Sequence, residues 1–128
     1  MVIDSSAVLA IMQGEPEKRS LNERIEADPV RLMSAASHLE IAIVIDDRFG
    51  DEGARDLKLF LTEAEVEIVP VTLDQAEIAR AAYRKFGRGN HPARLNFGDC
   101  LAYALARSAG ERLLFKGDDF SKTDIEAC

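Results

Sequence analysis

The chain has 128 residues, 47% of them hydrophobic and 30% charged, with a formal net charge of −7. This size and balance predict one globular domain spanning residues 1–128, and they exclude both a two-domain chain and a disordered one. Only two cysteines are present, no basic segment followed by an apolar one opens the chain, and no run of about 18 apolar residues occurs. We therefore expect a cytoplasmic protein without a disulfide framework, a secretory signal or a membrane span.

The first quarter of the chain predicts a strand followed by two helices. Residues 1–3 are apolar and end at Asp4, as a short buried strand would. A helix is expected over residues 6–13, where a Gly-Glu-Pro segment breaks it. Residues 17–28 have the spacing of a polar amphipathic helix.

The middle of the chain predicts two further strands around two helices. Residues 30–34 follow an Asp-Pro turn signal and have the character of a buried strand. Helical spacing of apolar residues runs from about 35 to 48 and again from 51 to 64, with Phe49-Gly50 as the break between the two helices. Residues 66–71 alternate and then become continuously apolar, as expected of a partly buried strand.

The last part of the chain predicts two helices and a closing strand. Thr72-Leu73-Asp74-Gln75 has the spacing of a capping box and opens a helix that reaches about Phe86. After a loop with Gly and Pro, a long helix begins at Asn96 and runs through Ser108, and residues 113–115 form a short apolar strand. Short strands that alternate with helices predict an α/β fold, a three-layer sandwich with a short, mainly parallel sheet flanked by helices.

Acidic residues fall where the strands are expected to end and where the following helices begin. In open parallel α/β sheets this edge holds the ligand site. Carboxylates gathered there repel one another unless a cation compensates, and an all-oxygen set suits Mg²⁺ or Mn²⁺ rather than zinc. Such an ion favours cleavage of phosphodiesters. The residues of this predicted site are Asp4, Glu40, Asp99, Asp118 and Asp119.

Each of these acids also has a purely structural interpretation. Glu40 lies three residues after Ser37, which is the spacing of a capping box, and Asp99 has the same offset from Asn96. The Asp118-Asp119 pair has the composition of a turn. The acid that ends the first strand has no structural task beyond capping a helix.

One basic stretch interrupts the acidic chain. No Asp or Glu occurs between Ile78 and Gly98. An acidic protein with one basic surface can still bind a polyanion locally, although four-residue spacing of arginines is also typical of the solvated face of a helix. The candidate nucleic-acid-binding residues are Arg80, Arg84, Lys85, Arg88 and Arg94.

Four segments of the chain resemble the PIN-domain ribonucleases of the VapC toxin type. Residues 1–7 resemble the family's opening strand with its metal-binding Asp, and residues 34–40 resemble the segment with the second acid. Residues 92–106 closely resemble the helix with the third acid, and residues 113–120 resemble the closing strand with the final acid. The four segments occur in the family's order and together cover essentially the whole chain.

The resemblance implies a Mg²⁺-dependent endoribonuclease whose metal-activated water attacks an RNA phosphodiester in line and leaves a 5′-phosphate and a 3′-hydroxyl. It implies Asp4 and Asp99 as primary metal ligands, with Glu40 completing the site and Ser6 as a hydroxyl close to the metal. The resemblance further implies an RNA substrate, a small inhibitory antitoxin whose C-terminal segment lies over the active site, and a homodimer.

The fourth acid is left open by the resemblance. Many relatives have an acid directly after the last strand, where this chain has Gly117. Either Asp118 or Asp119 is therefore a candidate for that role, and the RNA target is open as well.

Three other functions compete with this interpretation. A non-catalytic PIN-like module that binds RNA or protein would have no need of the acids, which such modules tend to lose. A phosphatase of the haloacid dehalogenase type needs a second Asp two residues after the first, where this chain has Ser6. A receiver domain needs a phosphoacceptor Asp at the end of a middle strand, and Val69-Pro70-Val71 offers none.

Overall fold

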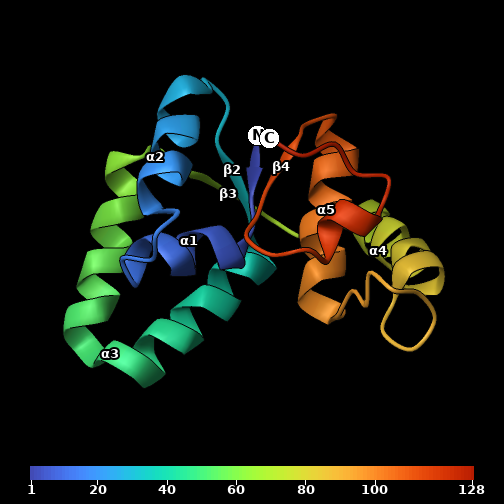
Figure 1. Cartoon of the computed structure of the whole chain (residues 1–128), viewed down its shortest axis with the longest axis horizontal. Coiled ribbons are helices and arrows are strands. Elements are labelled where there is room, and N and C mark those ends of the chain that lie inside the picture. Colours follow the sequence, from blue (N-terminus) through green and yellow to red (C-terminus); the bar gives the residue numbers. More distant parts are fainter.

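A four-stranded parallel sheet forms the centre of the molecule, and helices cover both of its faces (Figure 1). The computed structural model describes all residues, 1–128. The strands lie in the order β3-β2-β1-β4, and every pairing between them is parallel. Their bounds are β1 (Val2–Ile3), β2 (Leu32–Ser34), β3 (Glu67–Val69) and β4 (Leu113–Leu114). The predicted α/β fold with a short parallel sheet is confirmed.

Three helices lie on one side of the sheet, namely α1 (Ser5–Met12), α2 (Lys18–Ala27) and α3 (Ala35–Glu63). The long helix α3 bends at Gly50, whose φ of 62° and ψ of −152° are not helical. Glycine adopts this backbone conformation without a steric penalty. The predicted break at Phe49-Gly50 is therefore correct, although the helix resumes at once, and Figure 1 shows its two halves turning around α1. No helix is both long and apolar enough to cross a lipid bilayer.

The other side of the sheet carries α4 (Leu73–Phe86) and α5 (Phe97–Ala109), which pack against each other. The predicted cap of α4 is present, since the Thr72 hydroxyl accepts a hydrogen bond from the Gln75 N–H at 3.2 Å. A short 3₁₀ helix, η1 (Phe120–Lys122), follows β4.

Alternate residues of the central strands supply two separate hydrophobic cores. Val2 and Leu113 belong to the core under α4 and α5, whereas Ile3 and Leu114 belong to the core under α1, α2 and α3. Successive side chains of a strand point to opposite faces, so a strand covered on both sides must be continuously apolar. Asp4, the first charged residue after β1, therefore stands at the carboxyl edge of the sheet.

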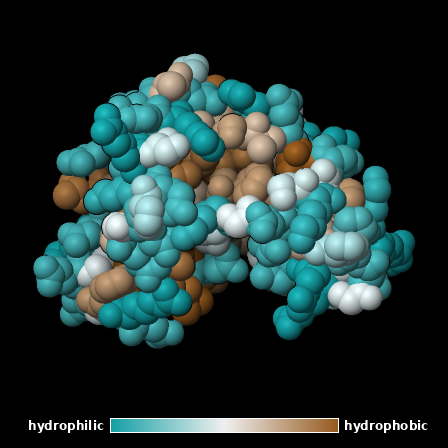
Figure 2. Space-filling view, in the orientation of Figure 1, coloured by the Kyte–Doolittle hydropathy of each residue, from teal (hydrophilic) through white to brown (hydrophobic).

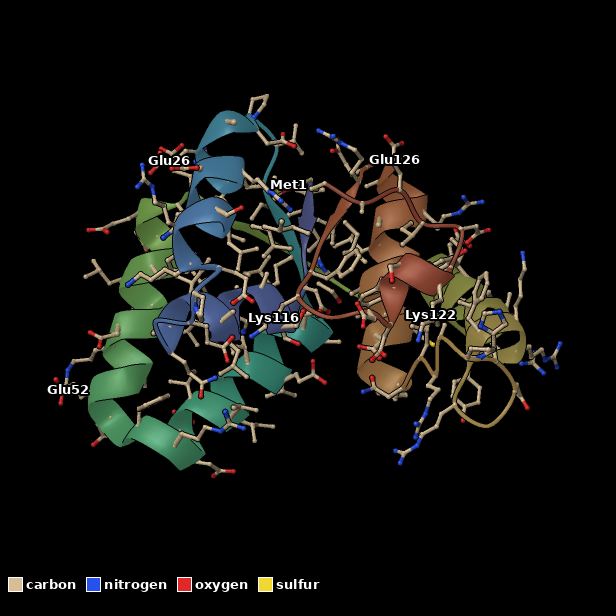
Figure 3. The ribbon with its side chains drawn as sticks, in the orientation of Figure 1. Met1, Glu26, Glu52, Lys116, Lys122 and Glu126 are labelled. Carbon is tan, nitrogen blue, oxygen red and sulfur yellow. The ribbon has the colours of Figure 1, made fainter.

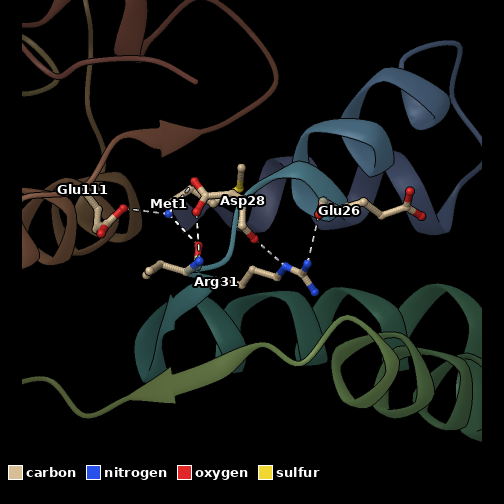
Figure 4. A network of polar contacts seen from close by, with 6 residues as sticks. Met1, Glu26, Asp28, Arg31 and Glu111 are labelled. Atoms are coloured by element: carbon tan, nitrogen blue, oxygen red, sulfur yellow. Dashed lines mark hydrogen bonds and ion pairs between the residues drawn. The ribbon is translucent and has the colours of Figure 1, made fainter.

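The strand predicted over residues 30–34 is regular only from Leu32, although the preceding Arg31 carbonyl already accepts the Glu67 N–H of β3 at 2.9 Å. The Val30 carbonyl accepts a hydrogen bond from the Met1 amine at 2.6 Å. The Arg31 guanidinium donates to three backbone carbonyls, those of Asp28, Ala64 and Glu26, at 2.9, 2.9 and 3.2 Å. Figure 4 shows this network with its acidic members, Asp28 and Glu111, whose carboxylates contact the same amine at 3.0 and 2.8 Å.

The strand predicted over residues 66–71 is also shorter than expected and ends at Val69. β3 is an edge strand with one neighbour, and Pro70 has no N–H with which to continue the ladder. The chain therefore leaves the sheet at this proline and enters α4 three residues later.

Candidate active site

Four acidic side chains from distant parts of the sequence gather at the carboxyl edge of the sheet. Asp4 follows β1, Glu40 lies near the start of α3, Asp99 lies in the first turn of α5, and Asp119 follows β4. The charges of the other three acids all raise the pKa of Asp99, so they lie within electrostatic reach of it. In Figure 2 the surface is hollowed between the side that carries α3 and the side that carries α5.

Asp4 is the most buried acid of the group, with 3% of its surface exposed. Its Oδ2 atom caps α1 by accepting the Ser6 N–H at 3.0 Å, while its Oδ1 atom is buried without any hydrogen-bond partner. Burial raises the pKa of this carboxyl, and hydrogen bonds from Ser6 oppose that effect. A buried carboxylate oxygen with no partner is costly, and it is available as a ligand for a cation.

Glu40 does not cap its helix. The N-cap of α3 is Ser34, whose hydroxyl accepts the Ala36 N–H at 3.2 Å, so the predicted Ser37–Glu40 capping box is wrong. Glu40 instead accepts a hydrogen bond from the Ser5 hydroxyl, at the start of α1. Its carboxylate is thereby directed across the sheet edge.

Gly98 allows α5 to approach this carboxylate closely. A Cβ atom at this position would overlap Glu40 Oε2, so only glycine fits there without a shift. Sequence reasoning missed both Gly98 and Ser5, because each acts through a contact with a residue distant in the sequence. The only sequence signal was the position of Gly98 directly before Asp99.

Asp99 has the structural role that its spacing from Asn96 predicts. The Asp99 carboxylate accepts the Asn96 N–H at 3.0 Å, and the Asn96 side chain accepts the Asp99 N–H at 2.8 Å. Burial and the neighbouring acids nevertheless raise the pKa of Asp99 to about 6, and the Asn96 hydrogen bond only partly opposes this. The cap uses one carboxylate oxygen, Oδ2, and the second is left for a further ligand.

Asp119 is distinguished from Asp118 by its electrostatic effect. Both side chains are exposed, and the Asp119 charge is among the main causes of the raised pKa of Asp99, whereas the Asp118 charge is not. Asp118 takes part in the turn through its carbonyl, which accepts the Ser121 hydroxyl at 2.6 Å. Asp119 is therefore the stronger candidate for the fourth acid, a role that stays a prediction.

Ser6 joins the start of α1 to the segment that leaves β4. Its hydroxyl accepts the Lys116 backbone N–H at 3.0 Å. The Lys116 ammonium forms ion pairs with Glu15 and Glu17, and Figure 3 shows this lysine beside α1. The contacts fix the segment that leads to Asp119.

The acid cluster fits a hard divalent cation in its chemistry. None of the four acids forms an ion pair with a basic side chain. Their side chains do not converge on one point in the way a preformed three-ligand metal site would. The unpartnered Asp4 Oδ1, the raised pKa of Asp99 and the all-oxygen donor set together indicate an uncompensated negative site that suits Mg²⁺ or Mn²⁺.

The predicted basic residues divide into two groups in the structure. Arg80, Arg84 and Arg88 line one groove beside α5. Lys85 points elsewhere, with its ammonium 3.7 Å from an Asp124 oxygen and 4.9 Å from the centre of the Phe86 ring. Arg94 lies in the loop before α5 and has a positive φ of 54°.

Comparison with known proteins gives a consistent set of matches. Residues 1–126 match the family model described as the PIN domain. The chain is 54% identical to VapC ribonuclease Mb0640 of Mycobacterium bovis over 125 residues, which cover 98% of this chain and 95% of the relative. It is also 54% identical to ribonuclease VapC of Mycolicibacterium smegmatis over 127 residues, covering 99% and 98% of the two chains.

Solved structures share the fold at much lower sequence identity. VapC20 of Mycobacterium tuberculosis, described as a toxin that cleaves the sarcin–ricin loop, superposes with a TM-score of 0.79 at 21% identity, over 99% of this chain and 97% of that one. VapBC2 of Rickettsia felis gives a TM-score of 0.77 at 12% identity, over 98% and 94%.

Proposed function

Since the chain belongs to the PIN-domain family and is similar along its whole length to VapC ribonucleases, we propose that it is a metal-dependent endoribonuclease and the toxin of a toxin–antitoxin pair. One observation carries the metal dependence: four acids from separate elements meet at the sheet edge without a basic partner, and one of them has an unpartnered buried oxygen. The net cost of that arrangement is relieved by a divalent cation.

Asp4 and Asp99 would hold Mg²⁺ or Mn²⁺ directly, and Glu40 would complete the site. When bound, the ion supplies a Lewis acid for the phosphate oxygens and a lowered pKa for water. Each of the three carboxylates is fixed by a hydrogen bond from the protein, namely from the Ser6 N–H, the Asn96 N–H and the Ser5 hydroxyl, respectively. The chain therefore keeps the ligands oriented before the substrate arrives.

The helices at this edge also favour an anionic substrate. α1 and α5 both begin at the acidic site, and the N-terminus of a helix carries a partial positive charge and free N–H groups. Ser6 holds the segment after β4 and thereby the distance of Asp119 from the other acids. The expected reaction is hydrolysis of an RNA phosphodiester with a 5′-phosphate and a 3′-hydroxyl as products.

An antitoxin partner follows from the same chemistry. Three of the solved structures with this fold are described as a toxin–antitoxin complex from Klebsiella pneumoniae, VapBC2 bound to promoter DNA, and FitAcB from Neisseria gonorrhoeae. An uncompensated group of carboxylates is a suitable partner for an arginine, which binds carboxylates through two parallel hydrogen bonds. We expect an inhibitory peptide to place a basic side chain here.

Cleavage of a mixed RNA pool tests the proposed function. The purified protein is assayed with Mg²⁺ and with EDTA, beside Asp4→Ala, Asp99→Asn and the control Asp56→Asn, which changes an exposed acid on α3. Metal-dependent cleavage that is lost in both site variants and kept in the control supports the proposal. Equal weak cleavage in all preparations, or none, would contradict it and favour a non-catalytic binding module.

A further inference from the structure

The segment that carries Asp119 forms a closed loop over α5. It leaves the sheet after β4 and returns to it at Glu126, whose carbonyl accepts the Leu113 N–H at 2.9 Å. Residues 115–126, the closing loop, include η1, and Figure 1 shows them in red, passing across α5. A compact loop whose two ends meet is held by its own side chains, so these side chains determine where Asp119 lies.

Two side chains hold the closing loop, one at the start of η1 and one after its end. Phe120 is 3% exposed and packs in the core under α4 and α5, with its ring centre 5.1 Å from that of Phe115. Asp124 accepts a hydrogen bond from the Tyr103 hydroxyl of α5 at 2.6 Å. A single buried ring would leave the loop free to turn about that contact, whereas a second fixed point sets its direction.

The second fixed point joins a buried donor to a charged acceptor. Tyr103 is buried, and a buried tyrosine hydroxyl needs a hydrogen-bond partner. Burial and the Asp124 carboxylate raise the pKa of Tyr103 to about 12, and the same hydrogen bond lowers the pKa of Asp124. The hydroxyl therefore stays a donor and the carboxylate stays charged at neutral pH, which makes the bond stronger than one between neutral groups.

Tyr103 also lies close to the acidic site along its own helix. It follows Asp99 by one helical turn, so the two side chains share a face of α5. Asp119 and Asp124 lie on either side of η1 in the closing loop, and the Asp119 charge acts on Asp99. The loop and the helix thus meet at two places: a hydrogen bond joins them at one, and two acids come together at the other.

We propose that Tyr103 and Asp124 are positioning residues of the active site, whose hydrogen bond orients the closing loop so that Asp119 stands beside Asp99. The proposal rests on the proposed function and on Asp119 as the fourth acid. A residue that only stabilises the fold would lower activity whether or not Asp119 is present. A positioning residue acts through the acid that it places, and its effect disappears with that acid.

A double-mutant cycle between Tyr103 and Asp119 tests this difference. Tyr103→Phe removes only the hydroxyl and should lower kcat for RNA cleavage about fivefold, with a change of less than about twofold in KM. In the Asp119→Asn background the same substitution should change kcat by less than about twofold. The matched control is Tyr83→Phe, which removes the hydroxyl of an exposed tyrosine on α4 and should leave kcat unchanged.

Two substitutions of Asp124 separate the hydrogen bond from an ion pair. The second Asp124 oxygen lies 3.7 Å from the Lys85 ammonium, and exposed pairs of this kind contribute little. Asp124→Asn keeps an oxygen that can accept the Tyr103 hydroxyl and should retain kcat within about twofold of the wild type. Asp124→Ala removes the acceptor and should reproduce the loss seen in Tyr103→Phe.

Amide hydrogen exchange in EDTA reports on the closing loop without catalysis. The Thr123 N–H donates to the Phe120 carbonyl at 3.0 Å, and the Ile125 N–H donates to the Thr123 hydroxyl at 3.2 Å. Both amides should exchange at least about fivefold faster in Tyr103→Phe and in Asp124→Ala, because the loop opens more often without its second fixed point. Amides in the middle of α5 should exchange at the wild-type rate, which would show that the fold is intact.

Three outcomes overturn the inference: unchanged exchange of the two loop amides, unchanged kcat despite faster exchange, or an equal loss of kcat from Tyr103→Phe with and without the Asp119 carboxylate. The last outcome would show that the hydroxyl acts by a route other than Asp119. The exchange measurement is independent of cleavage. Faster exchange in a protein that cleaves no RNA would keep the hydrogen bond as the anchor of the loop and remove the proposed function, so the two failures are distinguishable.

Discussion

Replacing Asp99 by Asn should stabilise the metal-free protein while it removes the enzyme's activity. The Asn side chain retains an oxygen that can accept the Asn96 N–H, so the cap of α5 is kept. What disappears is a charge that burial and the neighbouring acids disfavour. The substitution thus separates the structural task of this residue from its electrostatic cost.

The size of the effect follows from the raised pKa of Asp99. A shift from 3.8 to about 6 corresponds to at most about 3 kcal/mol at 1.36 kcal/mol per unit. Because the side chain is partly exposed, solvent screening reduces this to about 1–2 kcal/mol. The folded state holds the Asp99 proton more tightly than the unfolded state, so the contribution of this group to stability is fully present below pH 3.8 and is lost as the pH rises through about 6.

Urea unfolding in EDTA at pH 5 and pH 7.5 measures the effect. The free energy of unfolding of Asp99→Asn should exceed that of the wild type by about 1–2 kcal/mol at pH 7.5 and by less at pH 5. Asp56→Asn, an exposed acid on α3, should differ from the wild type by no more than about 0.5 kcal/mol at either pH. If Asp99→Asn were less stable than the wild type at pH 7.5, the acid cluster would have to be compensated within the protein, and the reasoning would fail.

Three further predictions concern the same site. Mg²⁺ should raise the melting temperature of the wild type more at pH 7.5 than at pH 5, because the carboxylates must be deprotonated to bind the ion. In the same thermal scan, Asp4→Asn should abolish the increase in melting temperature caused by Mg²⁺. Asp119→Asn should reduce kcat for RNA cleavage by about tenfold or more, whereas Asp118→Asn should change kcat less than twofold. Equal effects of the two substitutions would contradict the assignment of Asp119, and not Asp118, to the site. Gly98→Ala should displace the Glu40 carboxylate and lower activity by at least about tenfold, with little loss of stability because the atoms that must move are the end of a flexible side chain. An unchanged enzyme would show that the close approach is unimportant.

The fold could be predicted from the sequence because the strands are short and three of them, β1, β2 and β4, are mostly buried. The apolar opening segment and the closing Leu113-Leu114 leave few alternatives to a central parallel sheet, and the break at Gly50 was readable from the residue alone. The strand ends were not readable, because they depend on tertiary contacts. The Val30 carbonyl, for example, accepts a hydrogen bond from the Met1 amine, which is far from it in the sequence.

The parts of the site that escaped prediction are contacts between distant residues. Ser5 holds Glu40, and Gly98 makes room for it, yet neither relation leaves a pattern within a short window of sequence. The basic stretch gave a similar difficulty, since only the packing of α4 on α5 separates Arg84, which lines the groove, from Lys85, which turns to Asp124.

The structural and the functional interpretations of an acid at a helix start are compatible in this molecule. Asp4 and Asp99 both cap helices, and in each case the cap uses a single carboxylate oxygen, Oδ2. The hydrogen bond that satisfies the helix also fixes the rotation of the carboxyl group, and so determines where its other oxygen lies. In Asp4 that other oxygen is buried and unpartnered. Capping therefore supports the proposed ligand role instead of competing with it. An acid that caps a helix at the carboxyl edge of a parallel sheet is a better candidate for a metal ligand because the cap fixes its free oxygen.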